Sequence, residues 1–186
     1  GIYYEYDIQP LAGAASLDVI NHHPWPKPEW FDVVAIRRQL GPADGEKAHR
    51  LTCNVCGYPV EIMAGMMGLE EWLINLYEKP DIIKAGLRRI TDFFLAMMRK
   101  TIPECKEHLD ILYFADDLGT QHGSMISPDT YRDIVKPFHR ELFECGKNLA
   151  PDAKVMYHSD GSIGELLPDL IDAGLECLEP VQIEAA

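Results

Sequence analysis

The sequence predicts an α/β fold built on parallel strands, of the (β/α)8 barrel (TIM barrel) class, with this chain covering only part of the barrel. From residue 49 onward, short apolar runs alternate with amphipathic helical segments, which is the pattern of parallel strands joined by helical crossovers. No GxGxxG fingerprint or Walker loop occurs, which disfavours a nucleotide-binding doubly wound sheet. A closed barrel takes roughly 250 residues or more, and the units found here amount to about half of one. We expect one domain over residues 1–186, irregular at 1–48 and made of successive βα units over 49–186.

The net charge of the chain disfavours two classes of binding partner. The chain carries 17 Lys plus Arg against 30 Asp plus Glu, a formal charge of −13. Nucleic acid and anionic membrane surfaces bind basic proteins, so neither is expected as a partner. No apolar run approaches the roughly 18 residues of a membrane span, and no secretory leader is recognisable, so we expect a cytoplasmic protein.

The cysteines also favour a cytoplasmic protein. The five cysteines are an odd, scattered set, which is typical of reduced thiols rather than of a disulfide framework. Cys53 and Cys56 form one CxxC pair, which could be redox-active or half of a zinc site. Because no second pair follows and the flanking residues favour a strand, we interpret them as ordinary strand cysteines.

The first half of the chain is predicted to become regular only gradually. Prolines and glycines interrupt residues 1–48, where a short helix is expected over Leu17 to Asn21 after the capping residue Ser16. The elements expected next are a strand at 51–56, extended or irregular chain at 59–63, a turn at 65–68, and a helix at 69–78.

The second half alternates more clearly. Apolar residues at three- and four-residue spacing predict a helix over 81–100. Ser127-Pro128-Asp129 predicts the start of a helix that runs to Leu149, with a kink or a lost hydrogen bond at Pro137. Ser162 is expected to cap a later helix that ends at Gly174. The predicted strands of this half are 110–115, 154–157 and 176–178.

Polar side chains follow three of these strands directly. Asp116 and Asp117 follow the first, His158 and Asp160 the second, and Glu179 the third. Because parallel α/β folds bind ligands at the carboxyl ends of their strands, these groups are expected to share one rim, where they could bind a metal or exchange protons. Taken singly, each could instead cap a turn, bond to backbone or lie in solvent.

Two methionines near residue 65 are further candidates. Met63 and Met66, together with Met67, could line a pocket for a large flat or apolar ligand, because methionine adapts to irregular shapes. Core filling is the competing interpretation and the one that the pattern favours. Both residues are kept as candidates for substrate binding.

Several segments resemble the uroporphyrinogen decarboxylase superfamily. They include 113–121, 125–131, 136–139, 157–163, 167–174 and 178–182. The resemblance implies a (β/α)8 barrel and one of two chemistries: cofactor-free decarboxylation of uroporphyrinogen, or zinc-dependent methyl transfer between a small donor or thiol and a corrinoid protein. The sequence looks closer to the methyltransferase branch, because His158 matches the first residue of its His-x-Cys zinc motif.

This resemblance implies roles for the rim residues. His158, Asp160 and Glu179 would hold the metal, Asp116 and Asp117 would position substrate or move a proton, and Tyr113 and Gln121 would add hydrogen bonds to substrate. Asp160 stands where the branch has its zinc thiolate, and a further cysteine ligand is expected beyond Ala186. A carboxylate is a harder and less electron-donating ligand than a thiolate.

The partners implied are a small methyl donor or acceptor (methoxyl compound, methylamine or thiol) and a separate corrinoid protein. Outward-facing helices could also support a homodimer. Two alternatives stay open: a metal-free uroporphyrinogen decarboxylase, and a binding barrel that has kept the fold without the activity.

Overall fold

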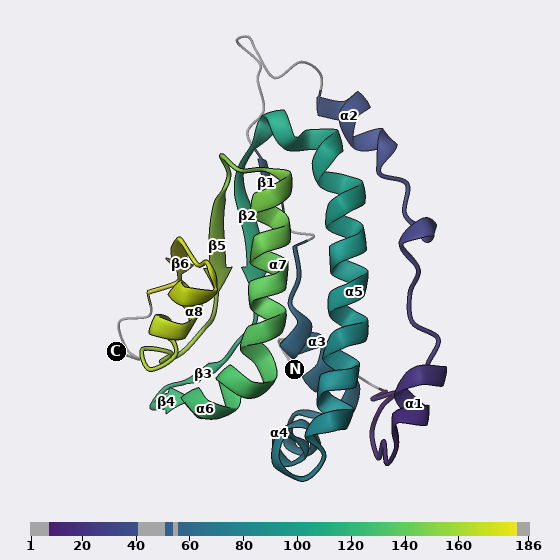
Figure 1. The fold of residues 1–186 in the computed structure, drawn as a ribbon, viewed down its shortest axis with the longest axis vertical. Coiled ribbons are helices and arrows are strands. Elements are labelled where there is room, and N and C mark those ends of the chain that lie inside the picture. The colour runs from purple at the N-terminus through teal and green to yellow at the C-terminus, as the bar shows by residue number, and fades with distance from the viewer. Residues whose placement is uncertain (1–7, 41–50, 54–55, 182–186) are drawn as a thin grey trace.

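A parallel sheet forms the centre of the computed structural model, which describes residues 8–40, 51–53 and 56–181. The strand order is β1-β2-β5-β6, and each neighbouring pair is parallel (Figure 1). The four strands are β1 (Leu51–Cys53), β2 (Leu109–Ala115), β5 (Lys154–His158) and β6 (Cys177–Glu179). The predicted fold class, part of a parallel (β/α)8 barrel, is confirmed.

The register of the sheet aligns the ends of its strands. Ala115 at the end of β2 lies opposite His158 at the end of β5, and His158 in turn lies opposite Glu179 at the end of β6. The residues that follow these three positions therefore leave the sheet at one level.

Helices cover one face of the sheet. The long helix α5 (Pro80–Cys105) and α7 (Lys136–Leu149) lie side by side over it (Figure 1). Phe114 of β2 packs edge-on against Phe143 of α7, with 4.7 Å between ring centroids. Because side chains alternate along a strand, Tyr113 and His158 point to the opposite face, where they are half-buried.

The helix α3 (Pro59–Met67) is the clearest difference from the sequence prediction. The prediction of extended or irregular chain at 59–63 was wrong, because Pro59 occupies the first turn of a helix, where its missing N–H costs nothing. Gly68, at φ +96°, ends α3 and begins α4 (Leu69–Glu78), the helix predicted at 69–78. The helix predicted at 81–100 is confirmed within α5.

The segment before α7 contains a π-helical turn where the sequence predicted a kink. Ser127 caps this region as predicted, because its hydroxyl oxygen accepts a hydrogen bond from the backbone N–H of Thr130 at 3.1 Å. Pro137 has no N–H to continue the α-helical ladder, and the chain widens just before it. The elements in order are α6 (Pro128–Thr130), the π-helical turn (Tyr131–Val135) and α7.

The last helix begins later than predicted. Ser162 does not cap it but forms a β-bridge with Thr120, and α8 runs over Leu167–Ala173. Gly174 ends α8 in the left-handed conformation, as predicted. The remaining short elements are α1 (Leu17–His22), η1 (Pro28–Trp30), α2 (Val34–Leu40), η2 (Lys106–His108), and the hairpin of β3 (Gly119–Thr120) and β4 (Gly123–Ser124).

The predicted strand at 51–56 is shorter in the structure. β1 ends at Cys53, residues 54 and 55 lie outside the described residues, and Cys56 is buried after the strand. Within the described part of the chain, no helix is long and apolar enough to cross a membrane.

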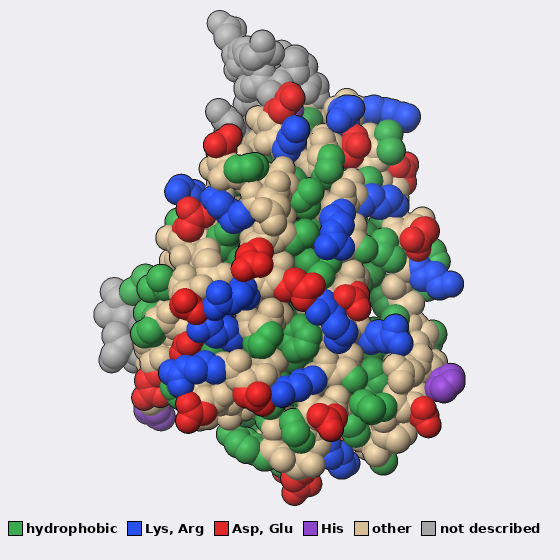
Figure 2. All heavy atoms as spheres, in the orientation of Figure 1, with side chains coloured by type: hydrophobic (Ala, Val, Ile, Leu, Met, Phe, Trp, Pro, Cys, Tyr) green, Lys and Arg blue, Asp and Glu red, His purple; other side chains and the backbone are tan. Residues whose placement is uncertain are grey.

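The helical surface is studded with charges of both signs (Figure 2). Several of them pair across neighbouring helices: Lys84 of α5 with Asp133 at 2.9 Å, and Lys136 of α7 with Asp169 of α8 at 2.6 Å. Lys136 and Asp169 are largely shielded from solvent, whereas Lys84 and Asp133 are exposed, and an exposed pair of this kind is worth little, about 0–1 kcal/mol. The stability of this layer therefore comes mainly from the apolar residues buried beneath it.

Candidate metal centre

Three polar side chains meet at the carboxyl ends of β2 and β5. One ligand atom from each of Asp117, His158 and Asp160 lies within 4.8 Å of the other two. His158 Nε2 is 3.6 Å from Asp117 Oδ1 and 3.9 Å from Asp160 Oδ1. This group is called the rim cluster below.

Two glycines hold the loops of the rim cluster together. A Cβ built on Gly119 would lie 2.5 Å from the carbonyl oxygen of Asp160, and one built on Gly161 would lie 2.5 Å from the carbonyl carbon of Gly119. Only glycine allows so close a crossing, and Gly161 also has a φ of +81°. Asp117 Oδ1 accepts a hydrogen bond from the backbone N–H of Asp160 at 2.9 Å, which ties the two loops directly.

His158 is oriented from behind by a carboxylate. Its Nδ1 lies 2.9 Å from Glu179 Oε1, and the hydroxyl of Tyr113 donates to the same oxygen at 2.5 Å. These contacts, the Tyr113 hydrogen bond above all, lower the pKa of Glu179, while burial and Glu179 raise the pKa of Tyr113 to about 12. An ionised Glu179 favours the tautomer that carries its proton on Nδ1, which leaves the Nε2 lone pair facing Asp117 and Asp160.

Asp116 lies beneath the rim cluster rather than in it. Its side chain is fully buried, and burial raises its pKa to about 6 in spite of its hydrogen bonds. Oδ1 accepts from the backbone N–H of Glu61 at 2.7 Å, and Oδ2 lies 2.9 Å from Nε2 of His139. The carboxylate thus satisfies an N–H in the first turn of α3, and a substrate at the rim would not reach it.

Two residues near this carboxylate were not predicted as site residues. His139 is buried beside Asp116, and its position within the apolar stripe of α7 was the available signal. Glu61 is an exposed residue in the first turn of α3. Partial shielding from solvent and the charge of Asp117 raise the pKa of Glu61, while His158 lowers it. No sequence pattern identified Glu61.

The other predicted site residues lie in different places. Met63 is fully buried and packs against Gly86 of α5, so it fills the core. Met66 is half-buried and lines an apolar cavity of about 140 Å³ with Trp25 and Phe94. Gln121 lies exposed in the turn of the β3–β4 hairpin. Glu179 touches His158 Nδ1 and lies outside the group of three ligand atoms.

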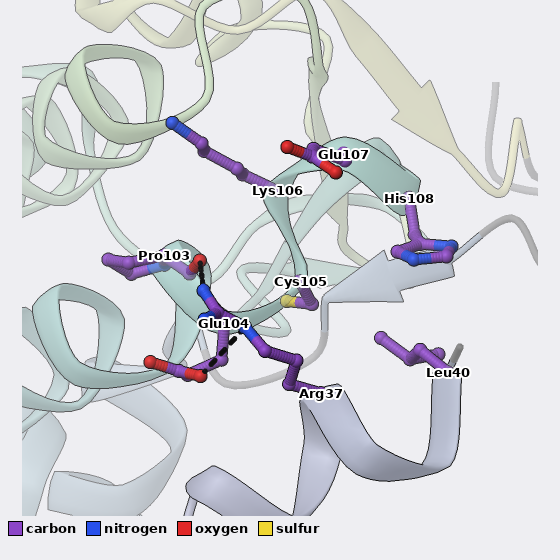
Figure 3. Close-up of a pocket in the computed structure, with 8 residues that line it drawn as sticks. All are labelled: Arg37, Leu40, Pro103, Glu104, Cys105, Lys106, Glu107 and His108. Atoms are coloured by element: carbon purple, nitrogen blue, oxygen red, sulfur yellow. Dashed lines mark hydrogen bonds and ion pairs between the residues drawn. The ribbon is translucent and has the colours of Figure 1, made fainter. Parts of the chain in front are cut away.

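A cavity of about 380 Å³ lies elsewhere, at the opposite end of β2 (Figure 3). Arg37 points there toward the carboxylate of Glu104 at 3.3 Å and the carbonyl of Pro103 at 3.4 Å. Barrel enzymes react at the carboxyl ends of their strands, and this cavity is at the amino end. We therefore assign the candidate site to the rim cluster.

The relationships of the chain agree with this architecture. The family model described as "Uroporphyrinogen decarboxylase (URO-D)" matches residues 46–180, which include every residue of the rim cluster. The chain belongs to the uroporphyrinogen decarboxylase family. No curated protein matches this URO-D family chain in sequence.

A solved structure is also similar to this URO-D family chain. It is a methyltransferase from Methanosarcina mazei, with a TM-score of 0.56 and 19% sequence identity, and the match covers 95% of this chain and 48% of that one. At this identity the likeness shows the fold. The chain spans about half the length of that methyltransferase.

Proposed function

We propose that this URO-D family protein is a metal-dependent methyltransferase, which exchanges a methyl group between a small donor or thiol and a corrinoid protein. The observation that carries the proposal is the pairing of an oriented imidazole with two carboxylates at the catalytic end of the sheet. The name of the similar Methanosarcina mazei structure is consistent with methyl transfer.

The rim cluster suits a divalent metal such as zinc. Zinc binds histidine nitrogen and carboxylate oxygen at about 2.0–2.2 Å, so tetrahedral ligands lie roughly 3.4 Å apart. The measured separations of 3.6 Å and 3.9 Å from His158 Nε2 need only small side-chain rotations to reach that value. With His158 neutral, the carboxylates of Asp117 and Asp160 balance the two positive charges of the ion.

Each residue of the site has a distinct task in this proposal. A bound metal supplies Lewis acidity, which lowers the pKa of a thiol or polarises the oxygen of a methoxyl donor. Glu179 and Tyr113 hold His158 in the ligating tautomer and orientation. Asp117 is held by the backbone N–H of Asp160, which keeps one of its oxygens directed at the cluster.

Porphyrinogen decarboxylation, after which the family is named, is the competing function. Its substrate carries several carboxylates, which Asp117, Asp160 and Glu179 would repel if no cation were bound between them. The acidic rim cluster therefore favours a metal-dependent methyltransferase over an enzyme that binds a polyanionic porphyrinogen.

Metal content and methyl transfer measured together test the proposal. The protein is purified without chelator, its metal is quantified by elemental analysis, and transfer from methylcobalamin to a simple thiol is followed by absorbance. We expect about one metal ion per chain and methyl transfer, both lost in His158→Ala. His122→Ala is the matched control, because His122 is an exposed histidine in the neighbouring hairpin turn.

The other outcomes separate the alternatives. Metal-free protein that converts uroporphyrinogen would identify a decarboxylase. Metal-free protein with neither activity would support a binding barrel.

A further inference from the structure

A chain of buried hydrogen bonds runs beneath the rim cluster. Nε2 of His139 lies 2.9 Å from Asp116 Oδ2, and Nδ1 of His139 lies 3.0 Å from the hydroxyl of Tyr131. The side chains of all three residues are no more than 1% exposed. Buried polar groups are costly unless paired, so this chain is held in one arrangement.

With Asp116 ionised, only one assignment of protons satisfies every member. The hydroxyl of Tyr131 donates to Nδ1 of His139, and Nε2–H of His139 then donates to the carboxylate of Asp116. The reverse tautomer would set the Nε2 lone pair against carboxylate oxygen. Tyr131 therefore fixes the tautomer of His139, and His139 fixes the orientation of the Asp116 carboxylate.

Asp116 connects the buried hydrogen-bond chain to the residues around the rim cluster. Its other oxygen holds the backbone N–H of Glu61, so the start of α3 is tied to the same carboxylate. Its own backbone N–H donates to the carbonyl of His158 at 3.1 Å, and its carbonyl accepts from the hydroxyl of Tyr157 at 3.2 Å. These two hydrogen bonds fix both backbone polar groups of Asp116, and Asp117 is the next residue in the chain.

We propose that His139 is a positioning residue for the metal centre, acting through Asp116 to fix Asp117 against His158. This inference rests on the metal site proposed above. His139 does not touch the rim cluster. Its removal leaves a buried carboxylate with one unpaired oxygen, and that carboxylate can regain a partner only by moving the chain at 116–117.

The test compares two variants of His139 by zinc affinity, measured by isothermal titration of the metal-free protein. His139→Leu removes the donor, and we expect zinc to bind about 10–100-fold more weakly, as for other residues that orient metal ligands. His139→Gln places an amide N–H near the position of Nε2–H, and we expect most of the affinity to return.

A control separates positioning from lost stability. Asn75 is also a buried polar residue, bonded within the α3–α4 region to the sulfur of Met67 and to Glu71. Asn75→Leu should lower the unfolding midpoint without changing zinc affinity. Zinc affinity in His139→Leu within twofold of wild type would overturn the proposal and leave the metal site intact.

Hydrogen exchange tests the positioning without metal. In His139→Leu the amide of Glu61 should exchange at least tenfold faster, while amides in the middle of α5 keep their protection and His139→Gln resembles wild type. If the wild type binds no zinc, the proposed function fails, and this exchange pattern alone decides the role of His139. Unchanged protection at Glu61 would refute it. If His139→Leu does not fold, Tyr131→Phe takes its place. We expect a smaller loss of zinc affinity and of protection at Glu61 in that variant. The absence of any loss would refute the role of His139.

Discussion

The crossing of the two rim loops at Gly119 makes the sharpest prediction about the site. In Gly119→Ala the new Cβ would lie 2.5 Å from the carbonyl oxygen of Asp160, which is 0.9 Å short of the 3.4 Å at which ordinary contact begins. Both partners are backbone, so the loops must separate by about that amount. Overpacking of this kind costs about 1–3 kcal/mol of unfolding free energy. Because Asp117 and Asp160 lie on the separated loops, zinc affinity should fall at least about tenfold.

Urea unfolding and zinc titration measure the two effects in the same preparation. Gly164→Ala is the matched control, because a Cβ at Gly164 meets no atom within 4 Å, and it should match wild type in both measurements. If Gly119→Ala unfolds at the wild-type urea concentration and binds zinc with wild-type affinity, the loops do not cross as described. The geometry assigned to the rim cluster would then be incorrect.

Three further substitutions test separate parts of the account. Glu179→Gln removes the charge that orients His158, and isothermal titration should show zinc affinity about 10–100-fold weaker; wild-type affinity would show that Glu179 has no orienting role. Burial raises the pKa of Asp116 from 3.8 to about 6, so its contribution to stability is fully present below pH 4 and is lost as pH rises through 6. Urea unfolding should therefore show wild type losing up to about 3 kcal/mol relative to Asp116→Asn between pH 4 and 7, and a constant difference would contradict this. Met63→Ala should cost about 2–5 kcal/mol in thermal or urea unfolding without weakening zinc binding, and weaker binding by the folded variant would return Met63 to the site.

The sheet and the position of the rim were predictable because both depend on local pattern. Short apolar runs predicted β2, β5 and β6, and the polar residues after them had to leave the sheet at its carboxyl end. The apolar runs could not predict the register of the strands. The register places Ala115, His158 and Glu179 opposite one another in neighbouring strands.

The two adjacent aspartates show that residue type alone does not predict which side chain lies in the site. Asp116 and Asp117 both follow β2, and both were predicted to be catalytic. Alternation along the strand distinguishes them, because Asp116 shares the side of Phe114, which faces the helices, whereas Asp117 shares the side of Tyr113. That signal was present in the sequence, but it required knowing which face of β2 the helices cover.

Helix α3 was missed for a different reason. Pro59 and Gly65 both count against a helix in a local reading, yet proline at the first turn is favourable, and packing against α5 outweighs the cost of one glycine. The bond from the backbone N–H of Glu61 to Asp116 spans 55 residues of sequence, so no local pattern could reveal it.

The proposed function depends above all on a metal ion bound at the rim cluster. A crystal grown with zinc and measured at the zinc absorption edge tests it most directly, because anomalous scattering locates the ion without assumption about its ligands. We expect one strong peak about 2.0–2.2 Å from His158 Nε2 and from carboxylate oxygens of Asp117 and Asp160. Anomalous density at other sites only, with the rim cluster empty at saturating zinc, would contradict it.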